Sequence, residues 1–74
     1  MIYFELSNDA DYIELIKLLK AENIASSGAE AKMMVEDQLV NVNGNLETRK
    51  RAKLREGDMV EIEERKIQIV KSKT

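Results

Sequence analysis

Apolar and polar side chains alternate along residues 2–6, with Ile2, Phe4 and Leu6 on the apolar side. Alternation with a period of two predicts a half-buried strand. After a short polar stretch, apolar residues recur at helical spacing through residues 11–23. This second pattern predicts an amphipathic helix with a wide apolar face.

The clearest helix start signal is Ser27, which is followed three residues later by Glu30. This spacing is that of a capping box, in which the two side chains satisfy free backbone amides at the start of a helix. It predicts a second helix that begins after Ser27 and ends near residue 37. The apolar side chains on its inner face would be Ala31, Met34 and Val35. Because the linker between the helices is short, we expect them to pack side by side.

Alternation returns after Gln38, where residues 39–42 lead into Asn43 and Gly44. Both residues tolerate a positive φ, which two-residue hairpin turns require. The pattern therefore predicts a strand followed by a hairpin turn.

Two more strands are indicated near the C-terminus, at residues 59–63 and 66–70, after a turn signal at Gly57 and Asp58. The predicted order is β-α-α-β-β-β, with one more short strand as an alternative. The fold class that we expect is α+β, with two short packed helices against a small, mostly antiparallel sheet. No repeat or linker divides the chain, so residues 1–74 are expected to form a single domain.

The amino-acid composition limits the kinds of catalysis and metal binding that this chain can perform. The chain has neither Cys nor His, and so lacks thiolate and imidazole metal ligands and the commonest general base. It has no Gly-rich phosphate loop, and carboxylates such as Glu61, Glu63 and Glu64 fall at expected surface or turn positions. We expect no enzymatic activity, no cofactor and no metal. Because no signal peptide or apolar run of about 20 residues is present, we expect a cytoplasmic protein without a membrane partner.

Positive charge is concentrated in residues 47–55, although the formal net charge is -2. Five of the 12 Lys and Arg residues lie there against Glu47 alone, which leaves seven basic and 13 acidic residues elsewhere. If residues 48–55 are extended, alternation puts the basic side chains on one side and Ala52 and Leu54 on the other. The basic residues of this predicted ridge are Arg49, Arg51, Lys53 and Arg55, with Lys50 beside them.

The ridge has two interpretations. One is a solvated edge strand whose charges prevent aggregation. The other, which the local density of charge favours, is an anion-binding surface, since screening lets a local patch act independently of the acidic remainder.

The start of the second predicted helix is a further candidate anion site. First-turn amides lack intrahelical acceptors, and Gly28 has no side chain to keep a phosphate away from them. Lys32 lies one turn further along the same face. Taken alone, the feature is equally typical of a capped helix that binds nothing.

The order of these motifs, "SSGAEAK", "LVNVNG", "ETRKRAKL" and "GDMVEI", resembles the S-four RNA-binding domain, also called the αL motif. The resemblance covers residues 13–63 and is greatest to small stand-alone bacterial proteins of this type. It implies an RNA-binding surface formed by the second helix and the loop that follows. Carried over to this chain, that surface consists of Ser27, Gly28, Lys32, Asn43, Gly44, Arg49, Lys50, Arg51 and Lys53.

Two positions depart from the family pattern. Many members have Gly where this chain has Gln38, which leaves the end of the second helix undefined. An Arg often follows the capping Ser, whereas this chain has Gly28 and so lacks one expected phosphate contact.

Three further residues are candidates for supporting roles. Asn43 and Thr48 could form hydrogen bonds to sugar hydroxyls, and Glu47 could orient Arg49 or Arg51.

The expected function is recognition of structured RNA, mainly through phosphate contacts. None of the three aromatic residues, Tyr3, Phe4 and Tyr12, lies in the basic segment, so we expect no stacking platform for splayed bases. Ribosomal and transfer RNA are the first candidates, with the ribosome as a candidate platform and the protein as a monomer. DNA remains open, because phosphate contacts alone do not distinguish it.

A β-grasp protein-interaction module is the alternative, because sulfur carriers and ubiquitin-like modules have a similar Asn-Gly hairpin and Gly-Asp turn. The carrier function itself needs a C-terminal Gly-Gly, whereas this chain ends "VKSKT". Only a β-grasp interaction module without RNA binding therefore remains as the second hypothesis.

Overall fold

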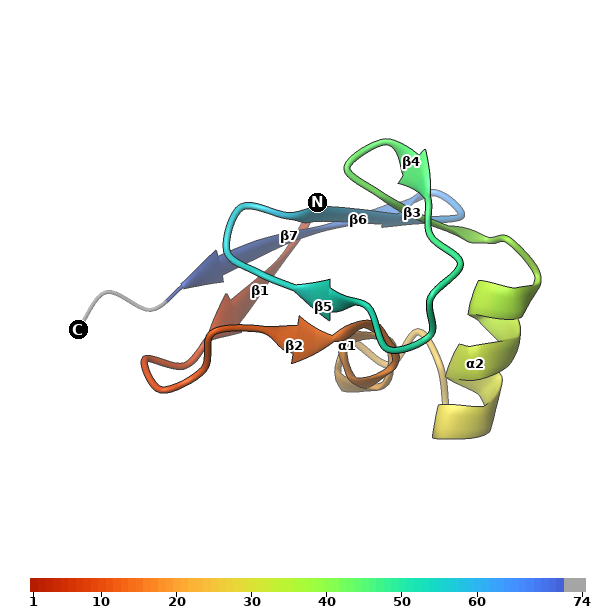
Figure 1. Ribbon diagram of the computed structural model, residues 1–74, viewed down its shortest axis with the longest axis horizontal. Helices are drawn as coiled ribbons and strands as arrows, with labels where there is room; N and C mark the ends of the chain where they lie inside the picture. Colours follow the sequence, from red (N-terminus) through yellow and green to blue (C-terminus); the bar gives the residue numbers. More distant parts are fainter. Residues whose placement is uncertain (72–74) are drawn as a thin grey trace.

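The structure is a computed structural model that describes residues 1–71. These residues form one five-stranded sheet, a short two-stranded ribbon and two helices (Figure 1). In chain order the elements are β1 (Ile2–Leu6), β2 (Ile13–Glu14), α1 (Leu15–Ala21), α2 (Gly28–Glu36), β3 (Val40–Val42), β4 (Asn45–Leu46), β5 (Lys53–Leu54), β6 (Met59–Ile62) and β7 (Arg65–Lys71). The predicted α+β class is confirmed.

The larger sheet has five strands in the order β1-β7-β6-β3-β4. Its pairs are antiparallel except for β1 and β7, which run parallel in a register from Ile2 opposite Ile67 to Leu6 opposite Lys71. The sequence predicts the mostly antiparallel character, but not the parallel pair between the two ends of the described chain.

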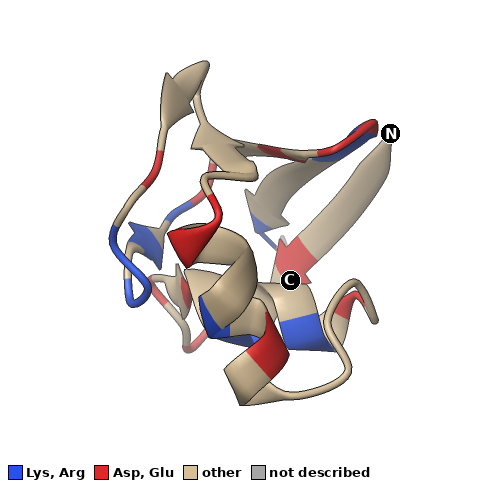
Figure 2. Ribbon diagram, turned by 90° about the vertical axis from the view of Figure 1, so that its right-hand side faces the viewer, with Lys and Arg blue, Asp and Glu red and all other residues tan. Residues whose placement is uncertain are grey.

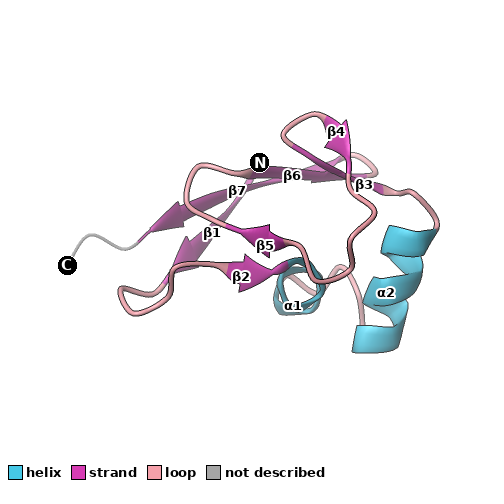
Figure 3. Ribbon diagram, in the orientation of Figure 1, coloured by secondary structure: helices cyan, strands magenta, loops and turns pink. Residues whose placement is uncertain are grey.

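The two-stranded ribbon pairs β2 with β5, so that Ile13 lies opposite Leu54 and Glu14 opposite Lys53. The amide of Leu15 donates to the carbonyl of Ala52 at 2.9 Å and extends the connection by one bond. Figure 3 shows this ribbon and α1 on the same side of the five-stranded sheet. The ribbon thus ties the segment before α1 to the basic segment.

The hydrophobic core lies between the sheet and the layer formed by the helices and the ribbon. Its buried side chains are Leu6, Leu15, Leu18, Leu19, Ala25, Ala31, Val35, Val40, Ala52, Leu54, Val60, Ile62, Ile67 and Ile69. Of the positions predicted to face inward, Leu6, Ala31 and Val35 belong to this cluster, and Ile2, Phe4 and Met34 pack against it as partly buried side chains. Ala52 and Leu54 belong to it, as their expected orientation requires.

The first helix is shorter than predicted, because Ile13 and Glu14 pair with β5 before α1 begins at Leu15. Helical periodicity alone predicts a start at residue 11. Backbone bonds to a distant strand therefore override the local pattern.

The start of α2 confirms the prediction. Ser27 is the N-cap, and its Oγ accepts a hydrogen bond from the amide of Glu30 at 3.1 Å. The return bond of the capping box is displaced by one residue, since the Glu30 carboxylate accepts from the amide of Ser26 at 3.0 Å and from its hydroxyl at 3.2 Å. Both serines therefore fix the first turn.

The end of α2 is closed by Gln38, which adopts a left-handed φ of 62°. Its amide donates to the carbonyl of Val35 at 3.1 Å, and the amide of Leu39 donates to that of Met34 at 3.2 Å. This pair of bonds is a Schellman motif, which usually has Gly at the left-handed position. Asn23, with a φ of 58°, ends α1 in the same way.

Replacing Gln38 by Gly is expected to raise the free energy of unfolding by about 0.5–1 kcal/mol, because glycine adopts the left-handed conformation without the Cβ penalty. Urea denaturation followed by circular dichroism measures the change. The control is Gln38→Ala, which removes the same side chain but keeps the Cβ and should give no gain. Equal stability of the two variants would contradict this account.

Replacing Ser27 by Ala is expected to lower the free energy of unfolding by about 1 kcal/mol, because the amide of Glu30 loses its acceptor. The matched variant Ser26→Ala retains the backbone bond to Glu30 and should cost less. A larger loss for Ser26→Ala would show that the displaced bond, and not the N-cap, holds the start of α2.

Candidate nucleic-acid interface

The basic segment forms a tight turn, which we call the basic turn, residues 49–53. The amide of Ala52 donates to the carbonyl of Arg49 at 3.2 Å and closes the turn. Within residues 48–55, only Lys53 and Leu54 belong to a strand. The condition under which the basic side chains would all point one way, an extended segment over residues 48–55, is therefore not met. Burial of Ala52 and Leu54 anchors the turn from inside, which turns its charged residues toward solvent.

Glu47 binds Arg49 at the start of the turn. The carboxylate accepts from the backbone amide of Arg49 at 2.9 Å, from its Nε at 3.1 Å and from its terminal nitrogen at 3.3 Å. Hydrogen bonding to this guanidinium lowers the pKa of Glu47, although burial opposes the shift. Glu47 is a buried acidic residue, and the Arg49 side chain remains 78% exposed.

Glu14 holds the second arginine of the turn. Its carboxylate accepts from the Nε of Arg51 at 2.8 Å and lies 3.5 Å from the ammonium of Lys17. The hydrogen bond from Arg51 is the main cause that lowers the pKa of Glu14. The Arg51 side chain is 79% exposed, so its terminal N–H groups face solvent and can donate elsewhere.

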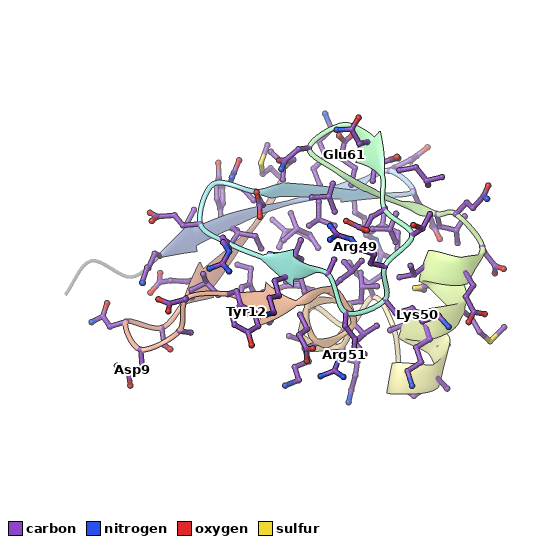
Figure 4. The ribbon with its side chains drawn as sticks, viewed as in Figure 1. Asp9, Tyr12, Arg49, Lys50, Arg51 and Glu61 are labelled. Atoms are coloured by element: carbon purple, nitrogen blue, oxygen red, sulfur yellow. The ribbon has the colours of Figure 1, made fainter. Side chains whose placement is uncertain are left out.

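Lys50 forms an ion pair with Glu36 at the C-terminal end of α2. In Figure 2 the backbone of the basic turn, in blue, lies on the same side of the molecule as the red C-terminal end of α2. Figure 4 shows Lys50 and Arg51 extending from the turn in different directions. Each of the three consecutive cations is thus held by a carboxylate from a different part of the chain.

Tyr12 lies against the same surface, contrary to the expectation that no aromatic residue would. Its ring centroid is 5.0 Å from the ammonium of Lys53 and 5.7 Å from the guanidinium carbon of Arg55. These distances allow cation–π attraction. Sequence reasoning missed Tyr12 because it is far from the basic segment along the chain, and it missed Lys17 because no pattern links it to Arg51.

The start of α2 presents a weaker anion site than the sequence suggests. The amides of Gly28 and Ala29 are in the first turn and lack intrahelical acceptors, and a Cβ at Gly28 would meet nothing within 4 Å. The carboxylate of Glu30, however, is bound to Ser26 at the same end of the helix. A phosphate there would approach an existing negative charge.

Lys32 is exposed on α2, one turn beyond Gly28. Along the helix, Gly28 lies about 12 Å from Glu36, where the basic turn makes contact. Ser27 and Gly28 are therefore at the end of α2 that is far from the basic turn, and Lys32 lies midway between that end and Glu36.

Asn43 and Gly44 form the predicted hairpin turn, with φ values of 52° and 84°. The Asn43 amide group donates to Asp58 at 3.0 Å and accepts from the amide of Met59 at 2.9 Å. Its side chain therefore joins two turns of the fold. Gly44 and Thr48 are exposed; a role in RNA binding for these three residues stays a prediction.

The described residues contain no pocket and no cluster of three acidic side chains placed to hold a metal ion. Neither helix within residues 1–71 is long and apolar enough to cross a membrane. The candidate interface is a charged outer surface.

Replacing Glu47 by Gln is expected to lower the free energy of unfolding near pH 7 by about 1–2 kcal/mol, because charge-assisted bonds to Arg49 are weakened. Folding lowers the pKa of Glu47 below its usual value of 4.5. The stabilisation is therefore present above pH 4.5 and is lost as the pH falls through the lowered pKa. The difference between wild type and variant should shrink over that acidic range.

Stability curves in urea at several pH values measure this effect. The control is Glu36→Gln, which removes an exposed carboxylate paired with Lys50 and should change stability by less than about 0.5 kcal/mol. A difference for Glu47→Gln that does not vary with pH would show that the charge of Glu47 is not what stabilises the turn.

Comparisons with known proteins agree with the fold. A family model described as the S4 domain matches residues 4–70. A protein of Escherichia coli (strain K12) named "Putative RNA-binding protein YbcJ" is 41% identical over 59 residues, which span 80% of this chain and 84% of that protein. "Uncharacterized protein YbcJ" of Shigella flexneri matches with the same identity and coverage.

The fold also matches a solved structure. The solution structure of YbcJ from E. coli, described as revealing an αL motif involved in RNA binding, superposes with a TM-score of 0.72. It is 38% identical to this chain, and the match covers 95% of this chain and 87% of that one. These findings support the S-four interpretation over the β-grasp alternative. Since the family model spans almost the whole of the described fold, the chain belongs to the S4 domain family.

Proposed function

We propose that this protein binds structured RNA, with the basic turn as the main phosphate-binding element. The observation that carries the proposal is that Arg49 and Arg51 are each fixed by a carboxylate while their side chains remain 78% and 79% exposed. The RNA-binding descriptions of the related YbcJ protein of E. coli support it.

The carboxylates leave enough donors for RNA. A guanidinium has five N–H groups, of which Arg51 uses its Nε–H and Arg49 uses two for their carboxylate partners. The remaining N–H groups can contact phosphate oxygens, as charge-assisted bonds. Because the turn and its partners fix these groups, their spacing is set before binding, which lowers the entropy cost of association.

The positive charge of this surface is moderate. We define the basic surface as the cations around the turn, namely Lys17, Arg49, Lys50, Arg51, Lys53 and Arg55. The carboxylates paired with them are Glu14, Glu36 and Glu47. Six cations and three carboxylates leave a net charge of +3, so we propose that fit to a defined arrangement of phosphates contributes alongside charge.

Ribosomal and transfer RNA are the first candidates for the structured RNA, and the ribosome is a candidate platform. We propose further that the protein acts in the cytoplasm as a single-domain monomer and as a binding module without catalysis. The family to which it belongs and the absence of His and Cys from its sequence support the binding role.

The double replacement Arg51→Gln with Lys53→Gln is expected to weaken binding to structured RNA strongly. If about three cations of the basic surface neutralise phosphates, the logarithm of wild-type affinity should fall with the logarithm of salt concentration at a slope of about -3, and the double variant, which removes two of these cations, should flatten the slope by nearly two units. Filter binding of total ribosomal RNA fragments and transfer RNA at several salt concentrations measures both quantities. Arg49 is left in place because its removal would leave the buried Glu47 without its partner.

The matched control is Arg65→Gln with Lys66→Gln, which removes one Arg and one Lys from exposed positions at the start of β7. This variant should bind nearly as well as wild type. Equal losses for the two double variants would mean that net charge alone decides binding, and salt-independent or absent binding by the wild type would refute the proposed function.

A further inference from the structure

The outer face of the β2–β5 ribbon is the part of the surface that phosphate binding alone does not explain. Ile13 and Leu54 face the core, and alternation therefore turns Glu14 and Lys53 outward. Continuing the register by one residue places Tyr12 opposite Arg55. The ribbon thus presents an aromatic ring and two cations side by side.

Tyr12 is held there by its neighbours. Lys53 and Arg55 lie 5.0 and 5.7 Å from its ring centroid, and the residue is 40% exposed. It does not belong to the buried core or to the partly buried side chains packed against it. Packing therefore does not account for an aromatic side chain at this position.

The ring is also continuous with the basic turn. Glu14, two residues along the ribbon, binds Arg51 at 2.8 Å. The pKa of Arg51 is raised mainly by its hydrogen bond to Glu14 and by the negative charge of that carboxylate. In Figure 4 Tyr12 lies below the β2–β5 ribbon, and Arg51 and Lys50 lie between it and α2, with Lys50 nearer to the helix.

We propose that Tyr12 and Arg55 form a stacking site for the base of an unpaired nucleotide, while Lys53 contacts the adjoining phosphate. Aromatic rings and guanidinium planes are the two kinds of surface on which proteins stack splayed RNA bases. This inference rests on the proposed function. It specifies the class of RNA ligand further, as structured RNA in which an unpaired nucleotide directly adjoins the phosphates that contact the basic turn.

The division of roles follows from the chemistry of the residues. Arg49, Lys50 and Arg51 can contact a backbone of any sequence, since phosphates carry no sequence information. A stacked base requires a strand that is free to leave the helix. The site therefore discriminates between a continuous duplex and a junction, bulge or end, and it does so without hydrogen-bond recognition of a particular base.

The test compares three RNA probes that share one duplex: blunt at both ends, with a short single-stranded 5′ tail, and with a short 3′ tail. A fluorescent purine analogue occupies the first unpaired position of each tail. Wild type is expected to bind at least one tailed probe roughly tenfold more tightly than the blunt duplex, as one stacked base allows. Binding should quench the analogue in the preferred tail.

Three variants isolate the ring. Tyr12→Leu should lose the advantage of the tail and the quenching, with a much smaller change in its affinity for the blunt duplex. Tyr12→Phe, which keeps the ring, should retain both. Tyr3→Leu removes the other exposed tyrosine, on β1, and should change neither. Circular dichroism of each variant checks that it folds.

The outcomes separate this inference from the proposed function. If wild type binds all three probes equally, or if Tyr12→Leu keeps the advantage of the tail, the stacking site is refuted while phosphate binding stands. If Tyr12→Leu folds but loses the blunt duplex and the tailed probes alike, Tyr12 only supports the phosphate-binding cations, and the stacking site is also refuted. If wild type binds none of the probes, both proposals fail.

Discussion

The pairing of β2 with β5 is the constraint on which the rest of the interface depends. Two residues on each strand, Ile13 with Leu54 and Glu14 with Lys53, connect segments that are distant in sequence. One side of this ribbon completes the core, and the other brings Glu14 to Arg51 and Tyr12 to Lys53. A change that separated these strands would expose core side chains and dismantle the charged surface together.

Carboxylates determine how the positive charge is displayed. An isolated row of arginines and lysines would repel itself and bind any polyanion. Here the partners are Glu47, which directly follows β4, Glu14 at the end of β2 and Glu36 at the end of α2. They reduce repulsion and restrict the orientation of the cations, which favours a defined geometry over general attraction.

Much of this structure is predictable from local patterns. Ser27 with Glu30 predicts the start of α2, and Asn43 with Gly44 predicts the hairpin turn, because both signals act within a few residues. The family resemblance predicts the fold and the basic segment as a candidate site, although the RNA contacts themselves stay predictions. The β2–β5 ribbon is not predictable in this way, because strands of two residues are too short to show a period. The contacts of Glu14 and Tyr12 depend on that ribbon, and the left-handed Gln38 lacks the usual glycine signal.

The place of β1 in the sheet has a consequence for how the chain folds during synthesis. Its pairing partner in the sheet is β7, so residues 2–6 cannot join the sheet until residues 65–71 have left the ribosomal tunnel. The helices, the hairpin and the ribbon use contacts of shorter range and can form earlier. Because closing so long a loop is slow, docking of the first strand is expected to be a late event in folding.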